Sequence, residues 1–275
     1  MRVDAHQHFW RVARGDYGWL TPQLGAIHRD FGPEDLHPLL ERHGIARTIL
    51  VQAAPTPEET TFLLELARDT PFVAGVVGWA DLTAGDAAEH IADLARNTHL
   101  VGLRPMVQDI PDDDWLVDPV LQPALDAMRR HRLVFDALVL PHHLARLSSV
   151  IARNPTLAFV IDHAAKPFVR ERNIEPWRTR LHEIAAWPNT FCKLSGLVTE
   201  AGPRWTVGDL VPYVDAVLSA FGPGRVLWGS DWPVVNLAGG YDRWIEATCT
   251  LLQPLAPDER AQVLGGTAKR VYLDR

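Results

Sequence analysis

The chain has 275 residues, of which 47 % are hydrophobic and 22 % are charged, a composition typical of a globular protein with a full hydrophobic core. Its net charge of −7 and its lack of a basic cluster argue against a nucleic-acid partner. No apolar run approaches the roughly 20 residues that a membrane-spanning helix needs. The first expected strand begins at Arg2 or Val3, so we expect a cytoplasmic protein with no signal peptide.

Short apolar segments recur along the chain, with helical patterns between them. Most of these segments are continuously apolar rather than alternating, which is typical of strands buried on both faces of a parallel sheet. We expect strands at residues 3–8, 48–53, 73–79, 101–105, 133–138, 159–163, 191–195 and 226–230.

Capping residues mark the helices between these strands. Pro33 and Gly44 enclose one helix, Thr56-Pro57-Glu58-Glu59 starts another as a capping box, and further helices begin at Asp118-Pro119 and near Thr206. Eight strands that alternate with helices predict one (β/α)₈ barrel, a single domain over residues 1–275. A doubly wound open sheet is the alternative, but no glycine-rich phosphate loop follows the first strand.

In such a barrel, the residues at the carboxyl ends of the strands meet at one mouth. Alternation along the first strand places His6 and His8 on the same face. The later strand ends contribute Gln52, Asp81, Arg104, Asp162, His163, Lys166, Lys193, Ser195, Ser230 and Asp231. Ionisable groups are costly to bury unpaired, so we interpret this mouth as a functional site. Two imidazoles and a distant carboxylate suit either a metal ion or a hydrolytic site without one.

The chain is also rich in tryptophan, with ten Trp against four Tyr. Trp19, Trp79 and Trp232 lie in or next to the loops of the expected mouth, where flat rings suit the C–H face of a sugar. His142 and His143 follow Pro141, and we interpret them as solvated or helix-capping residues. Cys192 and Cys249 have no CxxC partner and are expected to be buried, unpaired thiols.

Four motifs resemble those of the amidohydrolase superfamily, most of all its sugar-lactonase branch and more distantly the pyrone-dicarboxylate lactonases. They run in order from the first strand to the last: Asp4-Ala5-His6-Gln7-His8-Phe9-Trp10, Asp162-His163-Ala164-Ala165-Lys166-Pro167, Lys193-Leu194-Ser195-Gly196 and Gly229-Ser230-Asp231-Trp232-Pro233. The resemblance therefore covers nearly the whole chain.

The resemblance implies a distorted (β/α)₈ barrel that opens a small sugar lactone to its hydroxy acid. We expect a six-carbon aldonolactone of the L-fucono type, with rhamnono-, galactono- and arabinonolactones as the open alternatives. Asp231 takes the place of the family's water-activating base, and we expect partial burial to raise its pKa. The groups expected to polarise the carbonyl are His6, His8, His163 and Arg104. The groups expected to hold the sugar are Gln52, Lys166, Trp19, Trp79 and Trp232.

Two departures from the superfamily's two-metal pattern argue against a binuclear centre. Arg104 stands where binuclear members place a carbamylated lysine or a glutamate, and the fifth strand has no histidine. The resemblance implies that no metal is required, although His6, His8 and Asp231 could hold a single zinc ion. The alternative functions are a mononuclear zinc-dependent decarboxylase of the same superfamily and a non-catalytic barrel that binds sugar acids.

Overall fold

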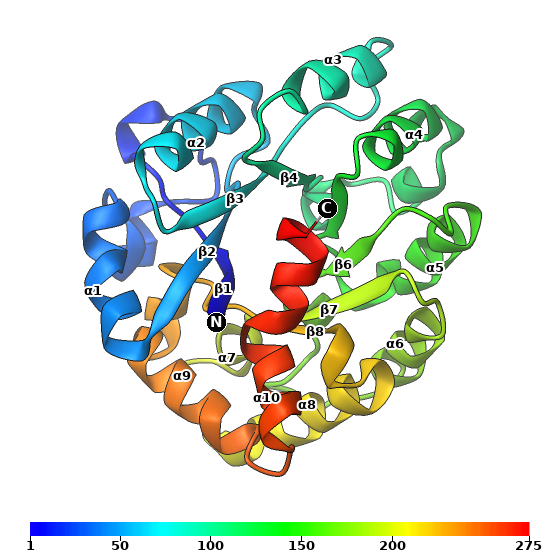
Figure 1. The fold of residues 1–275 in the computed structure, drawn as a ribbon. Coiled ribbons are helices and arrows are strands. Elements are labelled where there is room, and N and C mark those ends of the chain that lie inside the picture. Colours follow the sequence, from blue (N-terminus) through cyan, green and yellow to red (C-terminus); the bar gives the residue numbers. More distant parts are fainter. Residues whose placement is uncertain (275) are drawn as a thin grey trace.

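The computed structural model describes residues 1–274, in which eight parallel strands form a barrel surrounded by helices (Figure 1). The strands pair in chain order: β1 (Arg2–Gln7), β2 (Ile45–Val51), β3 (Val73–Gly78), β4 (Leu100–Leu103), β5 (Val134–Ala137), β6 (Phe159–Ile161), β7 (Thr190–Leu194) and β8 (Val226–Trp228). The ring closes where the Asp231 N–H donates to the His6 carbonyl at 2.8 Å and the His8 N–H to the Trp232 carbonyl at 2.7 Å. The predicted (β/α)₈ barrel is confirmed, and the strand ends differ from expectation by at most three residues.

Alternation along the strands divides the hydrophobic core into two parts. Side chains on one face of the strands, such as Ile49, Val77 and Val160, fill the barrel interior. Side chains on the other face pack against the helices. Both faces are therefore apolar and buried. This explains why the strands are continuously hydrophobic rather than alternating.

Most of the helices follow the strands on the outside of the barrel (Figure 1). They are α1 (Pro33–His43), α2 (Pro57–Asp69), α3 (Ala87–Leu94), α4 (Gln122–Arg130), α5 (Leu144–Arg153), α6 (Trp177–Ala185), α7 (Leu197–Ala201), α8 (Val207–Phe221), α9 (Gly240–Leu251) and α10 (Pro257–Ala261). The expected boundaries of α1, α2 and α8 are confirmed by Gly44 at φ 63°, by the Glu59 N–H that donates to Thr56 Oγ1 at 3.2 Å, and by the Thr206–Asp209 capping box.

The chain after α10 covers the amino-terminal end of the barrel. Two π-helical turns, Gln262–Gly266 and Lys269–Leu273, cross this end, which faces the viewer in Figure 1. Val271 and Tyr272 enter the interior and pack with the inward-facing strand residues. The chain therefore leaves the opposite, carboxyl-terminal end open as the mouth.

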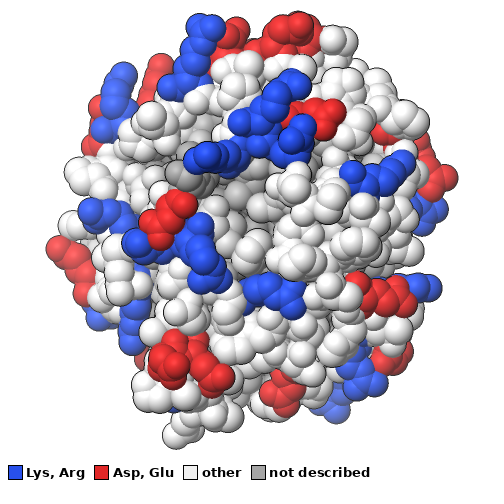
Figure 2. Space-filling model, turned by 45° about the vertical axis from the view of Figure 1, so that its right-hand side comes forward, with Lys and Arg blue, Asp and Glu red and all other residues white. Residues whose placement is uncertain are grey.

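Charged residues outside the barrel are of mixed sign: Lys and Arg side chains are interspersed with Asp and Glu over the face in Figure 2. No helix within residues 1–274 is both long and apolar enough to cross a membrane. Cys192 is buried, but Cys249 is exposed on α9, so that part of the cysteine prediction is wrong. His143 accepts the Leu140 N–H at 3.1 Å, so its predicted capping role is confirmed.

Candidate active site

Five polar side chains from different strands meet at the mouth of the barrel. They are at most 5 % exposed: His6, His8, Arg104, His163 and Asp231. Asp231 Oδ1 lies 3.3 Å from His8 Nε2, 3.8 Å from His6 Nε2 and 3.9 Å from His163 Nε2. The structure thus surrounds one carboxylate with three imidazoles.

The backbone bonds of β2 fix the orientation of His8. Its Nδ1 lies 2.7 Å from the Val51 carbonyl oxygen; because a carbonyl only accepts, Nδ1 carries the proton in the neutral ring. His8 Nε2 therefore presents a lone pair toward Asp231. Beside it, His6 Nδ1 lies 3.2 Å from the Lys193 ammonium and 3.5 Å from Asp162 Oδ1, so either neutral tautomer of His6 has a partner.

Asp231 owes its position to an unusual backbone conformation just after β8. Its φ is 57°, in the left-handed region that non-glycine residues seldom adopt. Burial alone would raise the pKa of Asp231, but the imidazoles of His163, His8 and His6 outweigh that effect and hold the pKa well below its usual range. The expectation of a raised pKa for Asp231 is therefore wrong, because it took account of burial but not of the three neighbouring rings. Asp231 is ionised at neutral pH.

Two of the histidines around this carboxylate, His163 and His6, are neutral at the same pH. Burial lowers the pKa of His163 to about 4, against the opposing effect of Asp231 and Asp162. Burial and the Lys193 ammonium likewise hold the pKa of His6 well below its usual range. The site therefore combines a charged acceptor with uncharged rings, which suits the transfer of a proton from water to Asp231.

The end of β6 turns sharply to bring His163 into the site. Residues His163 through Lys166 all have φ between 50° and 60°. Ser195 Oγ then lies 2.9 Å from His163 Nδ1, and a Cβ on Gly196 would lie 2.7 Å from the ring. Ser195 therefore orients His163, and Gly196 leaves room for it.

Arg104 is held by bonds to its neighbours on two strands. Its Nη1 lies 3.2 Å from Asp162 Oδ2, and its Nη2 donates to the Gln52 carbonyl. The Gln52 amide in turn donates to the Arg104 carbonyl at 2.7 Å. Gln52 is fully buried and hydrogen-bonded to Arg104, so it lies behind the site. The sugar-binding position that the sequence predicted for Gln52 is therefore not the one that the structure shows. Arg104 Nε has no hydrogen-bond partner among the described residues.

A network of buried charges supports the site from below. The ammonium of Lys193, which is fully buried, binds the carboxylates of Asp136 and Asp162, at 2.9 Å for the latter. The Tyr272 hydroxyl donates to Asp136 at 2.8 Å. Burial would raise the pKa of Asp162, but Lys193, His6 and Arg104 hold it well below its usual range. Lys193 therefore has a defined place beneath His6 and on the opposite side from the mouth.

Above these groups lies a hollow of about 180 Å³, which we call the central cavity. Its walls are His8, Trp19, Ala53, Arg104, Met106, Gln108, Asp109, Leu138, His163, Lys166, Asp231 and Val234. Lys166 and Trp19 thus line the same cavity as His8, His163 and Asp231. The Trp19 indole N–H donates to the Ala53 carbonyl at 2.7 Å. Met106, Gln108 and Asp109 were not predicted to line the site, although their position in the loop after β4 is one that lies at the mouth of such a barrel.

The other two expected sugar-binding tryptophans lie elsewhere. Trp79 lines a larger neighbouring cavity of about 580 Å³. Trp232 is 3 % exposed and packs edge-on against Phe9 and Phe31, with ring centroids at 6.0 and 5.2 Å. Its ring therefore belongs to the core, because the backbone turn that brings Asp231 to the mouth directs the next side chain away from it.

The donor atoms of the site fit one divalent metal ion. His8 Nε2 and Asp231 Oδ1 both offer lone pairs at 3.3 Å, which repel each other unless a proton or a cation lies between them. Tetrahedral zinc with bonds of about 2.0–2.2 Å separates its ligand atoms by about 3.3–3.6 Å. Asp231 Oδ1 lies 3.3–3.9 Å from the three imidazole nitrogens, and His6 Nε2 lies 3.2 Å from His8 Nε2, which is close to this separation. His6, His163 and Asp231 each offer a ligand atom within 4.8 Å of the other two. Asp162 Oδ1, which binds the Lys193 ammonium at 2.9 Å, could also accept from His6 Nδ1 behind such an ion.

A barrel whose first-strand histidine pair faces a sixth-strand histidine and a last-strand aspartate is an amidohydrolase-type barrel. The chain belongs to the amidohydrolase family, whose model matches residues 3–273. It is 52 % identical over 281 residues to the L-fucono-1,5-lactonase of Burkholderia ambifaria, covering 100 % of this chain and 96 % of that protein. The L-fucono-1,5-lactonase of Burkholderia multivorans is 40 % identical, over 99 % of this chain and 96 % of that protein.

A solved structure gives the same result. An amidohydrolase from Burkholderia multivorans, crystallised with bound zinc, superposes with a TM-score of 0.94 at 40 % identity and covers 99 % of both chains. The predicted membership of the superfamily and the resemblance to its sugar-lactonase branch are confirmed.

Proposed function

We propose that this chain hydrolyses a sugar lactone, an aldono-1,5-lactone like L-fucono-1,5-lactone, to the hydroxy acid. The observation that carries the proposal is the ionised Asp231 carboxylate among three imidazole rings at the floor of the central cavity. The two relatives named L-fucono-1,5-lactonase support the substrate class.

Asp231 acts as the general base in this proposal. It accepts a proton from water as the oxygen attacks the lactone carbonyl carbon, and it returns the proton to the ring oxygen as the ring opens. A carboxylate with a lowered pKa is a weak base, but it is fully ionised at neutral pH. A sugar lactone is already an activated ester, so a weak base suffices.

Donor groups at the cavity wall stabilise the negative charge that develops on the carbonyl oxygen. Arg104 supplies a fixed positive charge, and His163, oriented by Ser195, faces the same space. His6 completes the set from the first strand. The neutral ring of His8 bonds its Nδ1 proton to the Val51 carbonyl, so it has no free donor for the polarising role expected from the sequence. Lys166 and Trp19 hold the sugar hydroxyls and ring face from the rim.

A zinc ion, if bound, would be held by His6, His8 and Asp231, with His163 as a further donor. It would polarise the carbonyl and lower the pKa of bound water. We expect that the reaction does not require the ion, because Arg104 already supplies a positive charge beside the acceptor.

A panel of aldonolactones, assayed by proton release with and without a chelator, tests the proposal. We expect turnover of L-fucono-1,5-lactone that survives chelation. Failure to open any aldonolactone, with or without added zinc, would overturn the proposal. Zinc-dependent release of carbon dioxide from an aromatic acid would instead support the decarboxylase alternative.

A further inference from the structure

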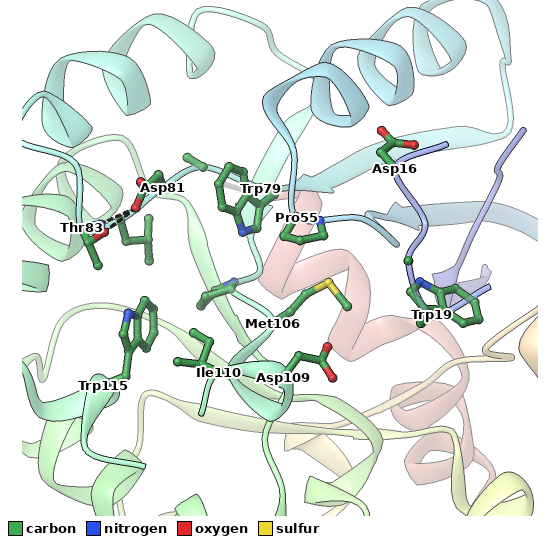
Figure 3. Close-up of a pocket in the computed structure, with 14 residues that line it drawn as sticks. Asp16, Trp19, Pro55, Trp79, Asp81, Thr83, Met106, Asp109, Ile110 and Trp115 are labelled. Carbon is green, nitrogen blue, oxygen red and sulfur yellow. Dashed lines mark hydrogen bonds between the residues drawn. The ribbon is translucent and has the colours of Figure 1, made fainter. Parts of the chain in front are cut away.

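The larger cavity lies beside the central one, over the ends of β2, β3 and β4. We call it the side cavity; it measures about 580 Å³ and is shown in Figure 3. Trp19, Met106 and Asp109 line both cavities, so the two spaces adjoin along these residues. A ligand in the side cavity can therefore be continuous with a lactone in the central one.

Three indole rings form much of the side cavity's wall. Trp19 comes from the loop after β1, Trp79 from the end of β3, and Trp115 from the 3₁₀ turn Trp115–Val117 (Figure 3). All three are only half-buried, so part of each ring is open to a ligand. Aromatic faces of this kind stack on the C–H face of a sugar ring.

The charged side chains that line the side cavity are all carboxylates. Asp16, Asp81 and Asp109 contribute carboxylates, and no Lys or Arg is among the described residues that line it. Hydrogen bonds from Thr83 lower the pKa of Asp81, which keeps it charged. Asp16 Oδ1 is buried and has no hydrogen-bond partner. These carboxylates accept from hydroxyl groups and repel an anion.

We propose that the side cavity is a subsite for an uncharged second sugar ring, joined by a glycosidic bond to the lactone in the central cavity. This inference rests on the proposed lactonase function and adds that the substrates include glycosyl-aldonolactones. The central cavity, at about 180 Å³, is smaller than the roughly 300–1,000 Å³ of most ligand sites. A lactone ring fills it, so a substituent on that ring must extend past Trp19 and Met106.

Two substrates with the same reacting ring test the subsite: D-glucono-1,5-lactone and cellobiono-1,5-lactone, which carries a glucosyl group on O4. We expect kcat/KM to be about tenfold higher for the disaccharide, the gain expected when a second ring stacks on an indole. Trp115→Ala should remove this gain and leave the monosaccharide unchanged, because Trp115 does not line the central cavity. Trp115→Phe should retain most of the gain.

Trp187→Ala is the matched control for loss of a half-buried tryptophan outside both cavities. Should Trp115→Ala fail to fold, Ile110→Trp fills the side cavity instead and should also remove the gain. Equal kcat/KM for the two lactones in the wild type would contradict the proposed subsite. An equal loss of kcat/KM for both lactones in folded Trp115→Ala would contradict it as well.

Calorimetric titration with cellobiose, which has no lactone to open, separates this inference from the proposed function. Binding of cellobiose that is lost in Trp115→Ala supports the subsite even if no lactone is turned over, in which case the lactonase proposal alone fails. Turnover of glucono-1,5-lactone without cellobiose binding or discrimination contradicts the subsite alone.

Discussion

Single residues of this barrel differ from their usual chemistry because they are buried beside specific partners. Asp231 stays charged because three imidazoles surround it. Glu59, at the start of α2, is the opposite case. Its carboxylate is fully buried and accepts the N–H groups of Ala53 and Ala54, and burial raises its pKa to about 7 against the effect of these bonds.

Glu59→Gln should make the pH dependence of stability weaker. A carboxyl whose pKa is raised by folding contributes stability that is fully present below its unfolded pKa and lost as the pH rises through about 7. Relative to the wild type, the variant should therefore gain about 2 kcal/mol in free energy of unfolding between pH 5 and pH 8. Denaturant titrations at the two pH values measure this difference.

Glu58→Gln provides the control, because Glu58 is exposed in the same helical turn. It should show no such change. A constant difference between Glu59→Gln and the wild type over this pH range would contradict a raised pKa for Glu59.

At the scale of elements, the mouth depends on tight turns that follow the strands. Gly196, after β7, has a φ of 68°, and any Cβ there would meet the His163 ring. Gly229, after β8, leaves room for His6 in the same way, since a Cβ would lie 2.6 Å from His6 Cβ. The glycines of these turns thus determine how closely the His163 and His6 side chains approach the backbone.

Gly196→Ala should lower kcat by about tenfold or more, because the added methyl group displaces His163. It should also cost about 1–2 kcal/mol of stability, since alanine is strained at this φ. Steady-state kinetics and denaturant unfolding measure the two effects. Gly224→Ala is the matched control: nothing lies within 4 Å of its added Cβ, so both quantities should stay near wild type. Wild-type kcat in Gly196→Ala would show that His163 does not need its present position.

Element order was predictable because the strands are buried on both faces and helix starts carry capping residues. The strand-end positions of His6, His8, Arg104, His163 and Asp231 followed from that order. The directions of nearby side chains did not follow. Trp232 turns into the core because Asp231 has a left-handed backbone. The Glu59 carboxylate accepts from Ala53 and Ala54 rather than from the N–H of the N-cap residue Thr56. Neither contact has a sequence pattern.

On the scale of the whole molecule, one end of the barrel is closed by the chain itself and the other holds the central cavity. The segment after α10 closes the amino-terminal end, and its Tyr272 reaches Asp136 in the interior. Asp136 binds Lys193, which lies next to His6. One continuous chain of contacts therefore runs from the carboxyl terminus of the described chain through the barrel to the mouth. Its long-range pairings could not be read from local sequence patterns.

Tyr272→Phe should lower the free energy of unfolding by about 1–3 kcal/mol, because a buried carboxylate loses a hydrogen-bond donor. Tyr213→Phe is the comparison, because the Tyr213 hydroxyl donates at 3.1 Å to the carbonyl of Phe168, an exposed residue. This substitution should lower the free energy of unfolding by less than Tyr272→Phe does. Equal stability losses in the two variants, measured by denaturant unfolding, would contradict a special role for the Tyr272 contact.

The most direct test of the whole account is Asp231→Asn, assayed on L-fucono-1,5-lactone. The substitution keeps the size of the side chain and removes its basicity. We expect kcat/KM to fall by about a thousandfold or more, with the unfolding transition retained. A folded Asp231→Asn variant with near-wild-type lactonase activity would contradict the assignment of Asp231 as the base.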